Sequence, residues 1–257
     1  MTNLQALIPE LTALARKASI AILDIYNAGF DVRNKADRSP VTEADDISER
    51  IILAGLTTLT PGIPAYGEEA VSRGEAKAEN LPARFWLVDP LDGTREFVAR
   101  NGEFAICIGL VVERRPALGV LHAPALDVTW SAAGAGSAMV SRRGAAPAPI
   151  RARRLPASGG VVVRSRSHGD NSAVEAIAAE RGIHQTHIQG SAIKFGLLAE
   201  GSADLYPRFG NTMEWDTCAG HAILEAAGGR VETITGGPLL YGKPGFRNGD
   251  FVASGAP

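Results

Sequence analysis

The chain has 257 residues, of which 45% are hydrophobic and 21% are charged, as in an ordinary globular protein with a sizeable core. A formal net charge of −2 at pH 7 gives no electrostatic reason to expect a nucleic-acid polymer or a membrane as a partner. We expect neither a secretory leader nor a transmembrane segment. Cys107 and Cys218 cannot build a disulfide framework, and their apolar surroundings favour reduced core residues in a cytoplasmic protein.

The first part of the chain predicts two amphipathic helices joined by a polar loop. Apolar residues from Leu4 to Ile25 recur at helical spacing, and Gly29 is a suitable C-terminal stop. We expect Thr42 to cap the second helix, whereas the local sequence leaves open whether Asp45 is a second cap or a functional group. The candidate core positions of the second helix are Ile47, Ile51, Leu56 and Leu59.

Two predicted strands end in carboxylates. A short strand ending at Gly67 runs into Glu68 and Glu69, and an apolar strand about twenty residues later runs into Asp89 and Asp92. Carboxylates three positions apart on a tight loop repel each other unless a cation compensates, and hard oxygen ligands suit Mg²⁺. An acidic turn with Asp92 as a helix cap is the simpler interpretation, but it leaves the other polar residues of the loop unexplained.

The residues after Asp92 favour an anion site, and a series of strands follows them. Gly93 lets the backbone approach a ligand closely, and the amides from Gly93 to Arg95 could cradle a phosphate at a helix start. The apolar run 104–112 predicts a buried strand, followed by a meander of further strands. We expect His122 to satisfy a local hydrogen bond, because no second metal-binding residue lies at ligand spacing.

Two segments of the second half combine basic and small residues. A strand at 159–163 runs into the sequence RSRSH at 164–168, which suits an anion as well as it suits a solvated turn. Lys194 follows the small residues Gly190 and Ser191 near a helix start, where a second anion could bind.

The last motif opens a helix at Glu214. Asp216 in its first turn is either an ordinary acid favoured by the helix dipole or a further member of the cation cluster. The Pro-, Ala- and Arg-rich segment 141–156 is the best linker candidate. We therefore expect one part at residues 1–150 and a second at 151–257.

Three ordered motifs resemble the signature regions of the inositol monophosphatase superfamily: GEE at 67–69, DPLDGT at 89–94 and WDTCAGHAILEAAGG from Trp215. Within this superfamily the chain is most similar to the 3'(2'),5'-bisphosphate nucleotidases of the CysQ type. The similarity to this branch lies in REFVARNGEFAICIGLV after Gly93, RSRSH at Arg164 and GSAIKFGLLAEGSADLYPRFG from Gly190. The segment 240–251 matches the closing segment of the family only loosely.

The resemblance implies an α+β fold, a layered α-β-α-β-α sandwich of the inositol monophosphatase and fructose bisphosphatase type with two packed subdomains. It implies a Mg²⁺-dependent phosphomonoesterase that removes the 3'-phosphate of adenosine 3',5'-bisphosphate, or of its sulfated form, in sulfate assimilation. Inositol-1-monophosphatase or fructose-1,6-bisphosphatase activity on the same fold is the alternative. A non-catalytic nucleotide sensor would predict a broken set of metal ligands, whereas the set is complete.

The same resemblance assigns roles to residues. One Mg²⁺ would be bound by Glu69, Asp89 and the carbonyl of Leu91, a second by Asp89, Asp92 and Asp216, and a third through water by Glu68. Thr94 and Asp45 would orient and deprotonate the attacking water. Substrate contacts would come from Gly93, Thr94, Ser165, Arg166, His168, Gly190, Lys194 and Arg208. We expect a small nucleotide as the partner, a monomer or homodimer, and a cytoplasmic location or peripheral attachment to the inner face of the cell membrane.

Overall fold

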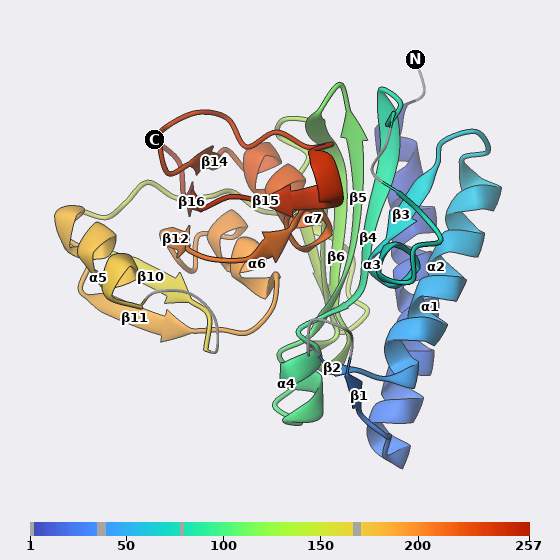
Figure 1. The fold of residues 1–257 in the computed structure, drawn as a ribbon. Coiled ribbons are helices and arrows are strands. Elements are labelled where there is room, and N and C mark those ends of the chain that lie inside the picture. The colour runs from blue at the N-terminus through green and yellow to red at the C-terminus, as the bar shows by residue number, and fades with distance from the viewer. Residues whose placement is uncertain (1–2, 35–39, 78–79, 167–170) are drawn as a thin grey trace.

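The computed structural model describes residues 3–34, 40–77, 80–166 and 171–257, whose helices and sheets alternate in five layers (Figure 1). A helix pair covers one face of a seven-stranded sheet, and a second helix pair lies between that sheet and a five-stranded sheet. One further helix covers the outer face of the smaller sheet. The expected α-β-α-β-α sandwich is confirmed.

The outer helix pair consists of α1 (Ile8–Ala28), which follows a 3-10 turn η1 (Leu4–Leu7), and α2 (Glu43–Leu59). Gly29 ends α1 with φ 99°, as expected for a glycine stop. Of the core positions expected in α2, Leu56 is fully buried, whereas Ile47, Ile51 and Leu59 are only partly buried. Ile52 is fully buried instead, so the buried face of α2 is rotated by about one residue from the expected face.

The seven-stranded sheet runs in the order β3-β4-β5-β6-β7-β8-β9. Strands β3 and β4 are parallel and all other neighbours are antiparallel. Strands β4 and β5 are buried on both faces because helices cover both, which explains their continuous apolar runs. In chain order the strands are β3 (Ala65–Gly67), β4 (Arg84–Asp92), β5 (Ala105–Val112), β6 (Arg115–Ala123), β7 (Val128–Ala133), β8 (Met139–Arg142) and β9 (Ala148–Pro149).

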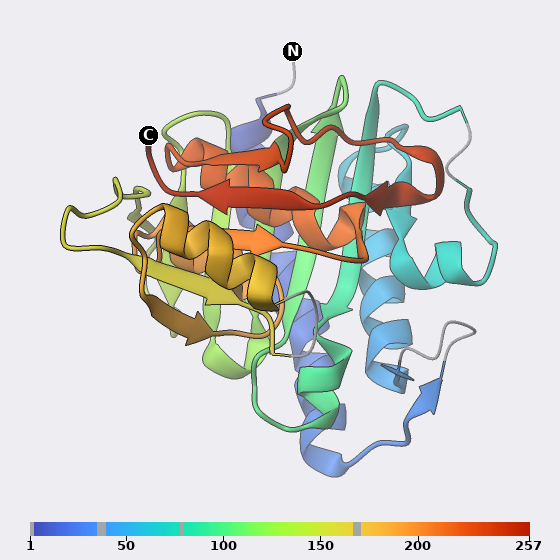
Figure 2. The ribbon, with the colours of Figure 1, turned by 60° about the vertical axis from the view of Figure 1, so that its left-hand side comes forward.

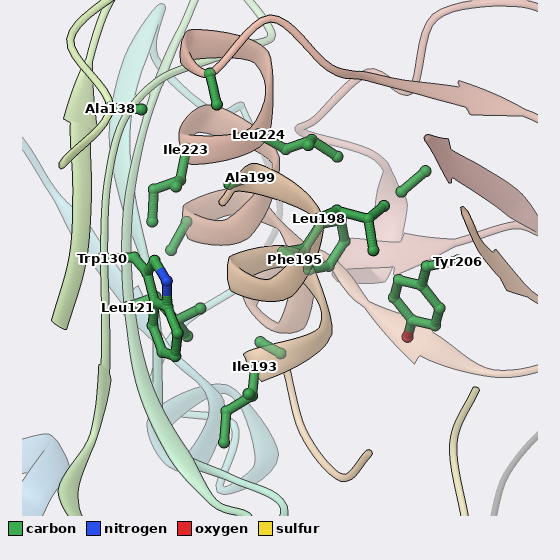
Figure 3. Packing of buried hydrophobic residues seen from close by; sticks show 14 of the residues in the cluster. Leu121, Trp130, Ala138, Ile193, Phe195, Leu198, Ala199, Tyr206, Ile223 and Leu224 are labelled. Carbon is green, nitrogen blue, oxygen red and sulfur yellow. The ribbon is translucent and has the colours of Figure 1, made fainter. Parts of the chain in front are cut away.

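The inner helices α6 (Ile193–Ala199) and α7 (Glu214–Ala226) form the centre of the molecule. Figure 3 shows Trp130 of the large sheet on one side of α6 and Tyr206 of the small sheet on the other, with Phe195 between them. Phe195 also stacks on Phe251 at 6.0 Å between ring centroids. The two sheets therefore share one apolar core through these helices.

The five-stranded sheet has the order β11-β10-β12-β16-β14, and α5 (Asn171–Glu180) covers its outer face. Its strands run across the direction of the seven-stranded sheet (Figure 2). In chain order they are β10 (Val161–Arg164), β11 (Gln185–Ile188), β12 (Leu205–Arg208), β14 (Arg230–Thr233) and β16 (Phe251–Ser254). The first sheet is built from residues 65–149 and the second from 161–254, and the proposed boundary near residue 150 falls in the segment between them.

Short elements complete the described part of the chain. They are β1 (Arg33–Asn34), β2 (Pro40–Val41), α3 (Glu68–Ser72), α4 (Thr94–Val98), η2 (Pro124–Leu126), β13 (Thr212–Met213), η3 (Pro244–Phe246) and β15 (Arg247–Asn248). Cys107 and Cys218 are buried free thiols, as expected. Within the described ranges, no helix combines the length and the apolar character needed to span a membrane.

Candidate active site

A carboxylate cluster forms where β3 and β4 end. These strands are parallel neighbours, with Gly67 opposite Val88, so the residues that follow them emerge at the same sheet edge. Glu68 begins α3 there, Asp89 lies near the end of β4, and Asp216 enters from the first turn of α7. Oxygen atoms of Glu68, Asp89 and Asp216 all lie within 4.8 Å of one another.

A bulge in β4 explains how Asp89 and Asp92, three residues apart on one strand, both line the same cavity. Asp89 pairs with Cys107 of β5 and Asp92 with Ala105, so one extra residue of β4 is inserted between them. Without it, residues three apart on a strand would face opposite sides of the sheet. Pro90 fits this position because it has no N–H to give to the ladder.

Burial and mutual repulsion raise the pKa values of these carboxyl groups. The pKa of Asp89 is raised well above its usual range by burial and by Glu68, Asp92 and Asp216. Burial and Asp216 raise the pKa of Asp92 to about 7, against the opposing charge of Lys194. Burial raises the pKa of Asp216 as well, although Met213 N–H and the Thr212 hydroxyl donate to its Oδ2 at 2.9 and 2.7 Å.

These residues fit a divalent cation. All are hard oxygen donors, they lie close together, and the uncompensated charge is what a cation would neutralise. Glu68 belongs to the three-residue cluster, whereas Glu69, the expected stronger ligand, is 4% exposed and its N–H donates to the buried carboxylate of Glu49 at 2.8 Å. Adjacent helical residues point about 100° apart, so both glutamates cannot face the cluster in the same way.

The Asp45–Thr94 pair is present. Asp45 is 2% exposed, and its Oδ2 accepts hydrogen bonds from the N–H and the hydroxyl of Thr42, both at 2.8 Å. Its Oδ1 accepts a hydrogen bond from Thr94 Oγ1 at 3.2 Å, and Leu91 O lies 3.3 Å from the same hydroxyl. Thr42 and Asp45 form a capping box, so Asp45 serves both as a cap and as the partner of Thr94.

Lys194 is a buried cation whose charge acts on Asp92 of the acidic loop. Its Nζ donates to the carbonyls of Gln189 and Ser191 and lies 5.0 Å from the ring centroid of Tyr206. Burial lowers its pKa to about 8, although the charge of Asp92 opposes this effect. Asp92 is fixed in turn by a hydrogen bond from Ala192 N–H.

A cavity of about 650 Å³ joins the acidic cluster to these basic groups. Gly93 lines it with φ 93°, and a Cβ at this position would lie only 3.1 Å from Glu103 O. The remaining expected residues on its wall are Glu68, Asp89, Leu91, Asp92, Thr94, Ser165, Lys194, Arg208 and Asp216. These residues come from both halves of the chain, and further residues of both halves complete the wall.

The structure places other expected substrate contacts differently. Arg166 pairs with Glu103 at 3.0 Å and does not belong to the described cavity wall, because its guanidinium is held by this carboxylate. Gly190 donates its N–H to the same carboxylate at 2.7 Å, and its neighbours Ser191 and Ala192 lie on the described wall. His168 lies outside the described residues.

Several residues of the site were not anticipated from sequence. Glu49 accepts the N–H groups of Glu69 and Ala70 at 2.8 Å and thereby fixes the acidic loop. Arg247 lies on the cavity wall although it belongs to the loosely matching segment 240–251. The residues next to Glu49 in its helix and next to Arg247 after its loop form no pattern from which these roles could be predicted.

Comparison with known proteins assigns this five-layer fold with its acidic cluster to a class of phosphatases. The sequence model of the Inositol monophosphatase family matches residues 3–253, so the chain belongs to this family. The 3'(2'),5'-bisphosphate nucleotidase CysQ of Escherichia coli O157:H7 is 45% identical over 250 residues, which cover 94% of this chain and 98% of the relative.

Solved structures agree with this assignment. The crystal structure of CysQ from Bacteroides thetaiotaomicron is 32% identical, with a TM-score of 0.80 and full coverage of both chains. An IMPase of Thermotoga maritima is 26% identical, with a TM-score of 0.76 and coverage of 97% of this chain and 92% of that chain. The family is therefore supported by sequence and by fold over nearly the whole chain.

Proposed function

We propose that this protein is a Mg²⁺-dependent phosphomonoesterase that hydrolyses the 3'-phosphate of adenosine 3',5'-bisphosphate to AMP and phosphate in the cytoplasm. The observation that carries the proposal is one cavity whose wall combines a carboxylate cluster with the basic residues Lys194 and Arg208. The 45% identity to a bisphosphate nucleotidase supports the same substrate class. Inositol monophosphate and fructose bisphosphate are the competing substrates on this fold.

The proposed metal ligands are the acidic residues of the cluster and its loop. They would hold two to three ions through Glu68, Glu69, Asp89, Asp92, Asp216 and the carbonyl of Leu91. When bound, Mg²⁺ supplies positive charge that acidifies a nearby water and offsets the charge of the phosphoryl oxygens.

Thr94 and Asp45 are proposed to prepare the attacking water. The Thr94 hydroxyl donates toward Asp45 and Leu91 O, so the lone pairs of its oxygen are available to accept a hydrogen from the water. Asp45 Oδ2 is held by two donors from Thr42, which keeps Oδ1 in place as the acceptor of the transferred proton. The amides that begin α4 at Thr94 would face the phosphoryl group.

The nucleotide is proposed to occupy the part of the cavity formed by the second half of the chain. The proposed contacts are Gly93, Ser165, Arg166, His168, Gly190, Lys194 and Arg208. Of these, Arg166 would have to exchange its pairing with Glu103 for a phosphate in order to bind. The buried ammonium of Lys194 has two carbonyl partners and therefore one remaining N–H for the substrate.

A metal titration tests the first half of this proposal. Asp89→Asn removes one charge from the cluster, and Asp24→Asn makes the same chemical change on an exposed face of α1. Calorimetric titration with Mg²⁺ should show high affinity for the wild type and for Asp24→Asn, and a loss of about 10-fold or more for Asp89→Asn. Asp89→Asn should also lose most turnover while keeping its fold. Near-normal turnover of Asp89→Asn at saturating Mg²⁺ would exclude Asp89 as a ligand.

A further inference from the structure

Two guanidinium groups on the cavity wall share one neutral partner, Asn211. Arg208 Nη2 donates to the backbone O of Asn211 at 2.8 Å, and Arg247 Nη2 donates to Asn211 Oδ1 at 2.6 Å. All three residues line the cavity. Asn211 is neutral, so it positions both cations without neutralising either of them.

Among the described residues, several arginines are paired with a carboxylate, and Arg208 and Arg247 are not. Arg153 pairs with Asp204 at 2.7 Å and Arg166 with Glu103 at 3.0 Å, whereas within the described residues neither Arg208 nor Arg247 forms an ion pair. The Nε of Arg208 is buried and has no hydrogen-bond partner there. Like charges held together beside a cavity are unfavourable unless an anion enters.

Arg247 is held in place from both sides along the chain. On one side, the fully buried carboxylate of Glu214 accepts the N–H groups of Gly242 and Lys243 at 2.7 and 2.9 Å and pairs with Lys243 Nζ at 2.7 Å. On the other side, Asn248 Nδ2 donates to Met213 O at 2.9 Å. The segment that carries Arg247 is therefore fixed to the start of α7.

The same anchoring brings Arg247 close to the proposed metal ligand Asp216. In the β13–β15 pair, Arg247 lies opposite Met213, and the N–H of Met213 donates to Asp216 Oδ2 at 2.9 Å. An anion bound by Arg247 would thus lie in the same cavity as a phosphate held at the acidic cluster. A substrate with two phosphates on one ribose has this arrangement of charge.

We propose that Arg247 is a specificity-determining residue that binds, together with Arg208, the phosphate of the substrate that is not cleaved. This inference rests on the proposed function and assigns the retained phosphate to a pair of guanidiniums from β12 and β15. Arginine suits this role because its planar fork binds phosphate through two hydrogen bonds.

Binding and turnover of four proteins test the proposal: the wild type, Arg247→Ala, Arg247→Lys and Arg230→Ala. Arg230 lies on β14 outside the cavity, so its variant controls for the loss of one positive charge. In metal-free buffer the acidic cluster repels phosphate, and titration with 5'-AMP against adenosine therefore reports on the arginine pair. Arg247→Ala should weaken 5'-AMP binding by about 10-fold or more without changing adenosine binding, Arg247→Lys should lie between, and Arg230→Ala should match the wild type.

Turnover gives a second, independent readout. Arg247→Ala should lower kcat/KM for adenosine 3',5'-bisphosphate by about 10-fold or more and for 3'-AMP by less than about 2-fold. Equal losses on both substrates, or an unchanged affinity for 5'-AMP, would overturn the assignment. If the wild type does not hydrolyse the bisphosphate, the proposed function fails, and the 5'-AMP titration still decides whether Arg247 binds a phosphate.

Discussion

Replacing Gly119 of β6 with alanine should displace α7 and thereby damage the acidic cluster without touching it. A Cβ at Gly119 would lie 2.2 Å from the carbonyl oxygen of Ala219 and 2.9 Å from its C and Cα atoms. Ordinary contacts of a Cβ begin at 3.4 Å, so the helix must move by roughly 1 Å. The obstacle is backbone, and no side-chain rotation can relieve it.

The size of the effect follows from this displacement. Overpacking a dense core costs about 1–3 kcal/mol, and a backbone clash lies at the upper end of that range. Because α7 begins two residues before Asp216, a shift of the helix also moves a cluster carboxylate. A misplacement of about 1 Å in an active site can lower the rate by about 100-fold.

Urea unfolding and initial-rate kinetics measure the two effects. Gly249→Ala is the matched control, since a Cβ there meets nothing within 4 Å. It should leave stability and kcat nearly unchanged, whereas Gly119→Ala should lower the free energy of unfolding by about 2–3 kcal/mol and kcat by about 10- to 100-fold. Wild-type stability and rate in Gly119→Ala would refute the close packing of α7 on β6.

Three further predictions concern single side chains. Thr94→Ala should lower kcat by about 100-fold with little change in KM, as for an interaction made mainly in the transition state, and a pure KM effect would instead assign Thr94 to substrate binding. Burial lowers the pKa of His122 to about 4, so its contribution to stability is complete above the unfolded value near 6.5 and is lost as the pH falls toward 4. Between pH 7.5 and 5.0 the wild type should therefore lose about 2 kcal/mol more than His122→Asn in urea unfolding, and parallel pH curves would contradict this. Glu214→Gln removes the charge partner of Lys243 and should lower the free energy of unfolding by about 1–3 kcal/mol. It should also raise KM for the bisphosphate, and an unchanged KM would mean that this carboxylate does not position Arg247.

Local patterns predicted much of the fold and of the acidic cluster. Helix α1 followed from helical spacing and Gly29, and the apolar run of β5 followed from burial on both faces. The Asp89 loop could be recognised because carboxylates that repel each other after a buried strand are unfavourable unless a cation compensates their charge. The local hydrogen bond expected for His122 is confirmed by Thr129 Oγ1 at 2.8 Å from its Nδ1.

The basic side of the cavity was harder to predict because it depends on long-range pairing. The sequence RSRSH at 164–168 does not show that Arg166 pairs with the carboxylate of Glu103, which lies 63 residues away in the sequence. Arg247 reaches the cavity only because β15 pairs with β13 and Glu214 holds the preceding loop. Charged residues that are far apart in the sequence become partners only in the folded protein, and neither periodicity nor composition predicts which of them pair.

Substrate selectivity is the most direct test of the proposed function. Phosphate release should be measured with Mg²⁺ on adenosine 3',5'-bisphosphate, inositol monophosphate and fructose 1,6-bisphosphate under identical conditions, with the nucleotide product identified by chromatography. We predict that kcat/KM for the nucleotide exceeds both other values. Its excess over inositol monophosphate should be about 100-fold or more, corresponding to one lost charged contact of about 3 kcal/mol, and the product should be 5'-AMP. A higher kcat/KM for inositol monophosphate, or release of the 5'-phosphate, would contradict the proposed function.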